Sequence, residues 1–73
     1  MTIGQTLRAL RGRRTQTQVA RDLNITSSAL SMYESDRRVP RDEVKMRIAR
    51  YYGQTVDDIF FQTERTNGAR KGG

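Results

Sequence analysis

The residue types that carry most enzyme chemistry are missing from this sequence. The chain has no cysteine and no histidine, so it offers no thiolate nucleophile, no imidazole general base and neither of the main zinc ligands. Its carboxylate clusters, Asp42 with Glu43 and Asp57 with Asp58, stand where helices are expected to begin, and negative charge is favourable there. The sequence therefore predicts a protein that is not an enzyme and that uses no metal or cofactor.

The arginines are the remaining candidates for chemistry, and their guanidinium groups suit the binding of phosphate. The net charge is +6, and residues 1–15 carry four arginines and no acid. Between residues 35 and 41, Arg37, Arg38 and Arg41 outnumber Asp36. Positive charge gathered in loop-bearing segments is typical of a surface that binds a polyanion, although a basic surface can also serve solubility alone.

Helical spacing of apolar residues predicts the elements that position these groups. Ile3, Leu7 and Leu10 predict a helix over residues 3–11, ended by Gly12. Thr15 with Gln18 forms a capping-box pattern that opens a short second helix, whose apolar face is Val19, Ala20 and Leu23. Asn24 tolerates the left-handed conformation that ends such a helix.

Three further helices follow. Thr26 caps a third helix, about residues 27–34, in which Ala29, Leu30 and Tyr33 form a narrow inward stripe. Pro40 suits the start of a fourth helix, and its inward residues are Val44, Ile48, Ala49 and Tyr52. Thr55 with Asp58 opens a short fifth helix that carries Val56, Ile59 and Phe60 or Phe61.

The expected organisation is one all-α domain over residues 1–61 and a disordered basic tail over 62–73. Helices two and three, joined by a short turn at Asn24, have the spacing of a helix-turn-helix. The sequence has no apolar run long enough to span a membrane and no signal-peptide core, so we expect a cytoplasmic protein.

The segment TQTQVARDLNITSSALSMYE resembles the lambda-repressor-like (Cro/Xre-type) helix-turn-helix family over roughly residues 3–61. The match rests on Gln16, the Val19 and Ala20 pair, Leu23, Leu30 and the closing Tyr33 and Glu34. Asn24 stands where the family usually has glycine, and the link from Arg11 to Gln16 is shorter than usual. The resemblance implies a compact five-helix fold whose third helix enters the DNA major groove.

The resemblance also assigns roles to individual residues. Base contacts are implied for Thr26, Ser27, Ser28, Ser31 and Met32; phosphate contacts are implied for Gln16, Ser35, Arg37 and Arg38. Arg13, Arg14 and Arg41 either add phosphate contacts or are solvated charges, and the serines could be only a solvated helix face. Arg11 and Glu34 correspond to a structural ion pair of the family.

A sequence-specific transcriptional regulator of double-stranded DNA, most simply a repressor, is the leading hypothesis. The resemblance implies a homodimer, formed at least on DNA, at a palindromic operator, in a bacterial, phage- or plasmid-encoded protein associated with the nucleoid. Tyr51 and Phe61 are the candidate dimer contacts, and core filling is the alternative for both. A basic RNA-binding protein or a protein-interaction module on the same fold remain alternatives.

Overall fold

The computed structural model describes residues 1–61 as five α-helices, and no strand occurs among these residues. The helices are α1 Ile3–Arg11, α2 Gln16–Leu23, α3 Ser27–Glu34, α4 Asp42–Tyr52 and α5 Val56–Phe60. This arrangement confirms the predicted all-α fold and the helix-turn-helix of α2 and α3. The tail predicted over 62–73 lies outside the described residues.

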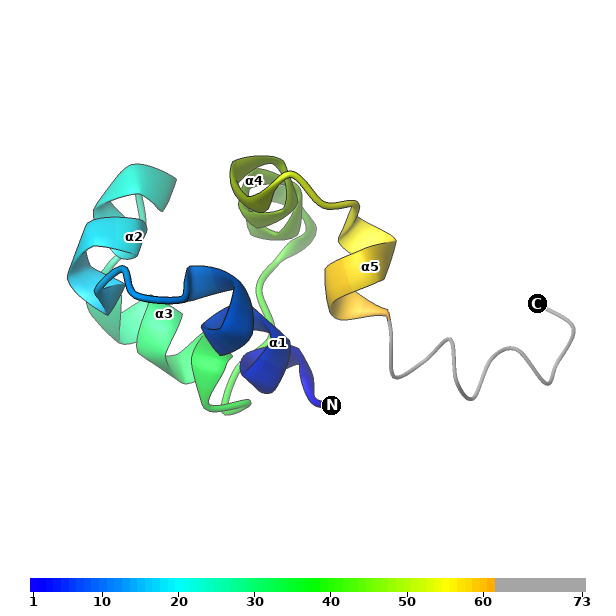
Figure 1. Cartoon of the computed structure of the whole chain (residues 1–73), viewed down its shortest axis with the longest axis horizontal. Coiled ribbons are helices and arrows are strands. Elements are labelled where there is room, and N and C mark those ends of the chain that lie inside the picture. Colours follow the sequence, from blue (N-terminus) through cyan, green and yellow to red (C-terminus); the bar gives the residue numbers. More distant parts are fainter. Residues whose placement is uncertain (62–73) are drawn as a thin grey trace, which may run out of the picture.

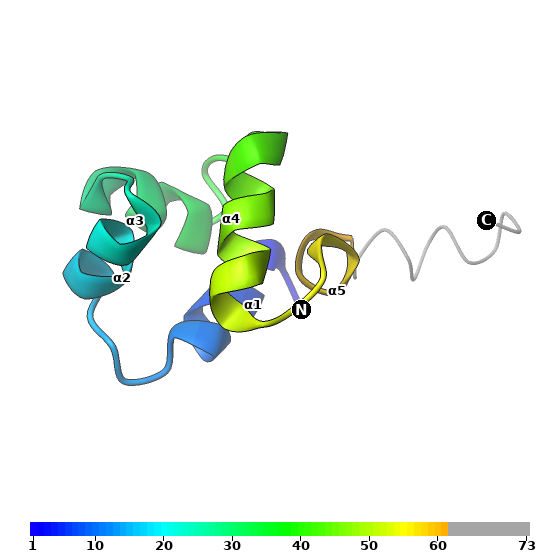
Figure 2. The same cartoon turned by 90° about the horizontal axis from the view of Figure 1, so that it is seen from above.

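The helix-turn-helix and the last helix lie on opposite sides of α4, and α1 contacts α3 and α5 (Figure 1). α2 and α3 lie together on one side of α4, and α5 lies on the opposite side (Figures 1 and 2). α3 packs against α1 and α2, α4 packs against α2 and α5, and α1 also contacts α5. Helices as short as α2 and α3 are marginal alone in water, so these contacts are what keep them folded.

A small apolar core joins all five helices. Its buried members are Leu7, Val19, Ala20, Leu23, Leu30, Tyr33, Ile48, Ala49, Ile59 and Phe60. Most of the predicted inward positions are confirmed. Six of them are only partly buried and pack against the edge of this core: Ile3, Leu10, Ala29, Val44, Tyr52 and Val56. Ala20 is 2% exposed in α2, and its small side chain leaves room for α3 to pack closely.

Three helices end with the same backbone arrangement. After α2, Asn24 takes left-handed φ and ψ of 60° and 43°, and the Ile25 amide donates to the Ala20 carbonyl. After α4, the Gln54 amide donates to the Ala49 carbonyl, with the left-handed Gly53 between them. After α3, the Arg37 amide donates to the Met32 carbonyl. These are Schellman caps, which satisfy carbonyls that a helix leaves unpaired at its end.

Threonine hydroxyls open four of the five helices. Those of Thr15, Thr26 and Thr55 accept a hydrogen bond from the amide three residues on. The complete reciprocal capping box is at Thr2 and Gln5, a pair that the sequence did not single out.

The fourth helix begins at Asp42, so the predicted start at Pro40 is wrong by two residues. Arg41 is the N-cap in extended conformation, and Pro40 is buried in the preceding loop. The later start puts Asp42 and Glu43 in the first turn, beside the unpaired amides, where their charge is stabilising.

None of the helices within residues 1–61 is long and apolar enough to cross a membrane. Across the same residues, the side chains that bind metals form no cluster of three.

Candidate nucleic-acid interface

α3 separates its side chains into a buried face and a solvent face. Leu30, Tyr33 and Glu34 are buried, whereas Ser27, Ser28 and Ser31 are exposed and Met32 is 39% exposed. The four exposed residues are those to which the sequence assigned base contacts. Thr26, the fifth, caps α3 by accepting from the Ala29 amide, so its hydroxyl hydrogen is still available as a donor.

The start of α2 presents backbone donors. The first helical hydrogen bond runs from the Val19 amide to the Thr15 carbonyl, and the Gln18 amide is taken by the Thr15 hydroxyl. The amides of Gln16 and Thr17 therefore point out of the helix end, where the dipole is also positive. This is the arrangement that binds a phosphate at a helix N-terminus.

Glu34 joins three elements beneath this surface. Its side chain is 2% exposed; Oε2 accepts from Arg11 Nε at 2.8 Å, and Oε1 accepts from Gln16 Nε2 at 2.9 Å. Arg11 also donates through Nη1 to the Arg14 carbonyl at 2.7 Å, which braces the short link between α1 and α2. Since an amide nitrogen carries two hydrogens, Gln16 keeps one donor for an external partner while Glu34 holds the group in place.

The arginine loop, residues 35–41, follows α3 directly. Arg37, Arg38 and Arg41 are exposed, and within residues 1–61 none of them forms an ion pair. The Ser35 hydroxyl donates to the Met32 carbonyl at 3.2 Å, so its hydrogen is already used inside the protein. Three guanidinium groups are thus presented to solvent in the loop that follows α3.

Asp36 fixes this loop to α1. It has a φ of 63°, and its Oδ1 accepts from the Gly4 amide at 2.8 Å. The Thr2 hydroxyl, the Gly4 amide and the Arg8 charge hold the pKa of Asp36 below its ordinary value of 3.8, against a smaller opposing effect of desolvation. From the sequence, Asp36 was recognised only as a negative charge that partly offsets the neighbouring arginines, and its contact with α1 was not predicted.

Gly4 is required at this contact because α1 and the end of α3 approach closely. A Cβ on Gly4 would lie 2.3 Å from the Glu34 carbonyl oxygen and 2.9 Å from Asp36 Oδ2. No local sequence pattern predicts the contact between Gly4 and Asp36, because the two residues are 32 positions apart.

Arg14 and Tyr51 belong to a second bridge, between α4 and the link before α2. Arg14 lies over the Tyr51 ring at 5.4 Å and donates to its hydroxyl at 3.1 Å, and that hydroxyl donates to Asp22 at 2.7 Å. Arg13 and Arg14 are both exposed, but the Arg14 guanidinium already has a partner within the chain. Tyr51 is partly buried and its hydroxyl is bonded within the chain, which weakens the case for it as a dimer contact.

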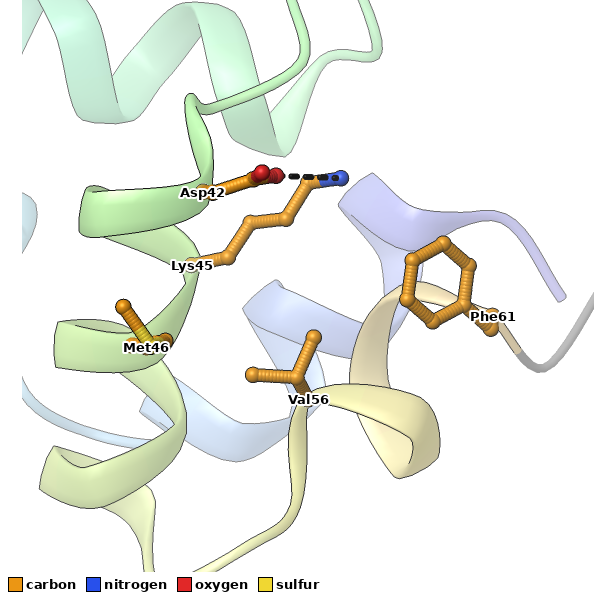
Figure 3. Close-up of a pocket in the computed structure, with 5 residues that line it drawn as sticks. All are labelled: Asp42, Lys45, Met46, Val56 and Phe61. Atoms are coloured by element: carbon orange, nitrogen blue, oxygen red, sulfur yellow. Dashed lines mark ion pairs between the residues drawn. The ribbon is translucent and has the colours of Figure 1, made fainter.

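Phe61, the other candidate dimer contact, lines a shallow groove of about 460 Å³ between α4 and α5 (Figure 3). Val56 and the 54%-exposed Met46 supply the rest of its apolar surface. Lys45 extends along the groove, with Nζ 3.9 Å from Asp42 and 5.0 Å from the Phe61 ring centre.

Arg47 fixes α4 to the helix-turn-helix. Its Nη1 donates to the Leu23 carbonyl at 2.9 Å, and its Nη2 pairs with Glu43 at 3.3 Å. Leu23 is the last residue of α2, so a cation here both satisfies a terminal carbonyl and complements the helix dipole.

The exposed α3 face, the amides that open α2 and the arginine loop provide hydroxyls, backbone donors and guanidinium groups. These are the kinds of group that proteins use to contact phosphates and base edges. Fold and surface thus define a helix-turn-helix DNA-binding domain. A family model described as a helix-turn-helix domain matches residues 2–59, and the chain belongs to this family, of the Xre/Cro-like lambda-repressor type. The protein is accordingly a DNA-binding transcriptional regulator and not an enzyme. No curated protein and no solved structure matches the chain.

Proposed function

We propose that this protein is a sequence-specific repressor that places α3 in the major groove of an operator. The observation that carries the proposal is the polar solvent face of α3, flanked by the open amides of α2 and the unpaired arginines of the arginine loop. A solvated helix face alone would not need cations at one end and directed amides beside it.

The proposed base contacts are made by Thr26, Ser27, Ser28, Ser31 and Met32. Serine hydroxyls donate or accept and discriminate modestly, and the Met32 side chain can pack on a thymine methyl group. None of these side chains makes the two-point contact that arginine, asparagine or glutamine makes with a base. We therefore assign an appreciable part of the specificity to DNA shape and bridging water.

The proposed phosphate contacts are made by Arg37, Arg38, the Gln16 side chain and the amides of Gln16 and Thr17. Ser35 contributes less, because its hydroxyl hydrogen would first have to leave the Met32 carbonyl. Arg41 and Arg13 add to the positive field. These contacts fix orientation and register without reading sequence.

A repressor role follows from the simplest mechanism available to such a domain. A protein that only occupies its operator can exclude RNA polymerase, whereas activation needs a further contact with the polymerase. We place this activity in the cytoplasm, on the DNA of the nucleoid.

We further propose that two copies bind a palindromic operator, with half-sites about 34 Å apart. Phe61 and Met46, in the groove between α4 and α5, are the better candidates for the contact between copies, because Tyr51 is engaged by Arg14 and Asp22. Sedimentation with and without the operator tests this point: a Phe61→Ser variant should bind one half-site normally and lose the cooperative second binding.

Selection of random duplexes by the purified protein tests the function. The selected sequences should converge on two inverted half-sites. Arg38→Ala should weaken binding to every duplex and lower the slope of log K against log salt by about 1. Ser28→Ala should change the ranking among duplexes by about 1 kcal/mol or less. Arg50→Ala, an exposed charge in the last turn of α4, is the matched control and should change little.

Equal affinity for duplex DNA, single-stranded DNA and structured RNA would contradict the proposal and favour the RNA-binding alternative. Convergence on no sequence, together with unchanged binding by both Arg38→Ala and Ser28→Ala, would show that this face of α3 is not the binding surface.

A further inference from the structure

Asp36 is an unusual residue to find near the start of a loop that is proposed to bind phosphate. Its carboxylate stands directly before Arg37 and Arg38, and a negative charge near DNA opposes binding. Its φ of 63° is also unfavourable for a residue with a side chain, and glycine would adopt it at less cost. Charge and conformation both argue against an aspartate here, unless the side chain has a task.

The contacts of Asp36 identify that task. Oδ1 accepts from the Gly4 amide at 2.8 Å, and Gly4 lies in the first turn of α1, where amides lack helical partners. The side chain thus caps α1 from a distant part of the chain, and the positive end of the helix offsets the negative charge.

The same contact restrains the arginine loop. On one side of Asp36, the Arg37 amide donates to the Met32 carbonyl at 2.9 Å, and the Asp36 amide donates to Tyr33 at 3.2 Å. On the other side the carboxylate is bonded to α1, and α1 itself lies against the end of α3 at Gly4. The backbone that carries Arg37 and Arg38 is therefore tied to two helices.

We infer that Asp36 is a positioning residue for DNA binding: it holds Arg37 and Arg38 in place by tying the arginine loop to the start of α1. This inference rests on the proposed function. Because the loop is already ordered in the free protein, the free energy of DNA binding is not reduced by the conformational entropy lost in ordering it. On this inference, the gain from an ordered loop outweighs the repulsion between the Asp36 carboxylate and the DNA.

If Asp36 positions the loop, removing its negative charge should weaken DNA binding, whereas simple electrostatics predicts that it should strengthen binding. Asp36→Gly raises the net charge by one and suits the left-handed backbone, so charge and conformation alone both predict equal or tighter binding to DNA. If Asp36 positions the loop, this variant binds a selected duplex more weakly, by about fivefold for one lost hydrogen bond.

Two further variants complete the binding experiment. Asp36→Asn keeps an acceptor for the Gly4 amide and tolerates the left-handed conformation, so it should restore most of the affinity. Asp57→Asn removes one acid on the α5 side, and it should bind as tightly as the original protein or slightly more tightly. Circular dichroism and thermal unfolding establish that every variant is folded. Binding by Asp36→Gly that is equal to or tighter than the original would overturn the inference.

A second measurement needs no DNA and separates the two proposals. Backbone ¹⁵N relaxation of the free protein should show lower order parameters at Arg37 and Arg38 in Asp36→Gly than in the original protein or Asp36→Asn. Unchanged order in Asp36→Gly would overturn the inference whatever the protein binds. Failure of the original protein to prefer any duplex would overturn the proposed function, while relaxation would still decide whether Asp36 orders the loop.

Discussion

Among single residues, Glu34 links α1, α2 and α3 through its two carboxylate oxygens. It is the one charged side chain among residues 1–61 that is almost wholly buried, and it is held by Arg11 and Gln16. A buried carboxylate is tolerated only when it is paired and hydrogen-bonded, and both conditions are met here.

Glu34→Ala should lower the free energy of unfolding by about 3 kcal/mol, because it leaves the partly buried Arg11 without its counter-charge and releases Gln16. Glu34→Gln should cost less, since an amide can still bond to Gln16. Urea denaturation of both variants measures the difference. A loss below about 1 kcal/mol for Glu34→Ala would show that solvent replaces the pair without cost.

The Tyr52 hydroxyl presents the opposite situation. It is buried and has no hydrogen-bond partner within residues 1–61, and burial together with the Glu34 charge raises the pKa of Tyr52 to about 12. Since an unsatisfied buried hydroxyl is costly, Tyr52→Phe should leave the free energy of unfolding unchanged or raise it by up to about 1 kcal/mol. Thermal unfolding tests this, and a clear loss of stability would reveal a partner for the hydroxyl.

Asp36 should make stability depend on pH in the acid range. Its pKa in the folded protein lies below the ordinary 3.8, so the carboxylate stabilises the fold above that pH, and the contribution is lost as the pH falls through the lowered pKa. The stability difference between the original protein and Asp36→Asn should be present at about pH 6 and shrink as the pH falls below the ordinary pKa of 3.8, and it should be smaller in high salt. A difference that is constant with pH would contradict this account.

At the scale of elements, the decisive contact is between the first turn of α1 and the end of α3. Exchanging glycine for alanine inside a helix normally stabilises it, but at Gly4 the added Cβ would overlap the Glu34 carbonyl. Gly4→Ala should therefore lower the free energy of unfolding by about 2 kcal/mol.

Ala9→Gly is the matched control in the same helix. Ala9 is exposed, so its replacement should cost about 1 kcal/mol through helix propensity alone. If Gly4→Ala were stabilising, α1 could move away from α3, and the close approach would not constrain the fold.

Local features of the elements could be predicted from the sequence, whereas contacts between distant segments could not. Features set by near neighbours were predictable: the Thr15 and Thr26 caps and the left-handed Asn24 each depend on residues within one or two turns. Contacts between Gly4 and Asp36, or Arg14 and Tyr51, join segments more than thirty residues apart, and no local pattern encodes them. The start of α4 was misplaced because proline is acceptable both in a loop and at the first helical position.

The exposure of the candidate base-reading residues was predictable for a different reason, whereas their role is what the family resemblance implies. Helical periodicity decides which face of residues 27–34 is apolar, and the remaining Ser27, Ser28, Ser31 and Met32 are exposed. Periodicity cannot show that Ser35 bonds to its own helix or that Arg14 stacks on tyrosines, because these depend on side-chain rotamers and on tertiary neighbours.

At the scale of the whole molecule, two basic segments that are far apart in the sequence become neighbours. α1 carries Arg8, and its first turn is bonded to the arginine loop through Asp36. The helix-turn-helix of α2 and α3 lies on one side of α4, and α5 lies on the opposite side (Figure 1), and the apolar groove is lined by residues of α4 and α5 together with Phe61 (Figure 3). This division suits a protein that binds DNA with one surface and a second copy with another.

Contact between the solvent face of α3 and DNA can be observed by amide NMR during titration with a selected duplex. If α3 lies in the major groove, the largest chemical-shift changes should fall on residues 16–18, 26–32 and 35–38, and they should diminish together as salt is raised. Unchanged α3 amides at saturation, with the main changes on another face of the domain, would contradict this placement of α3.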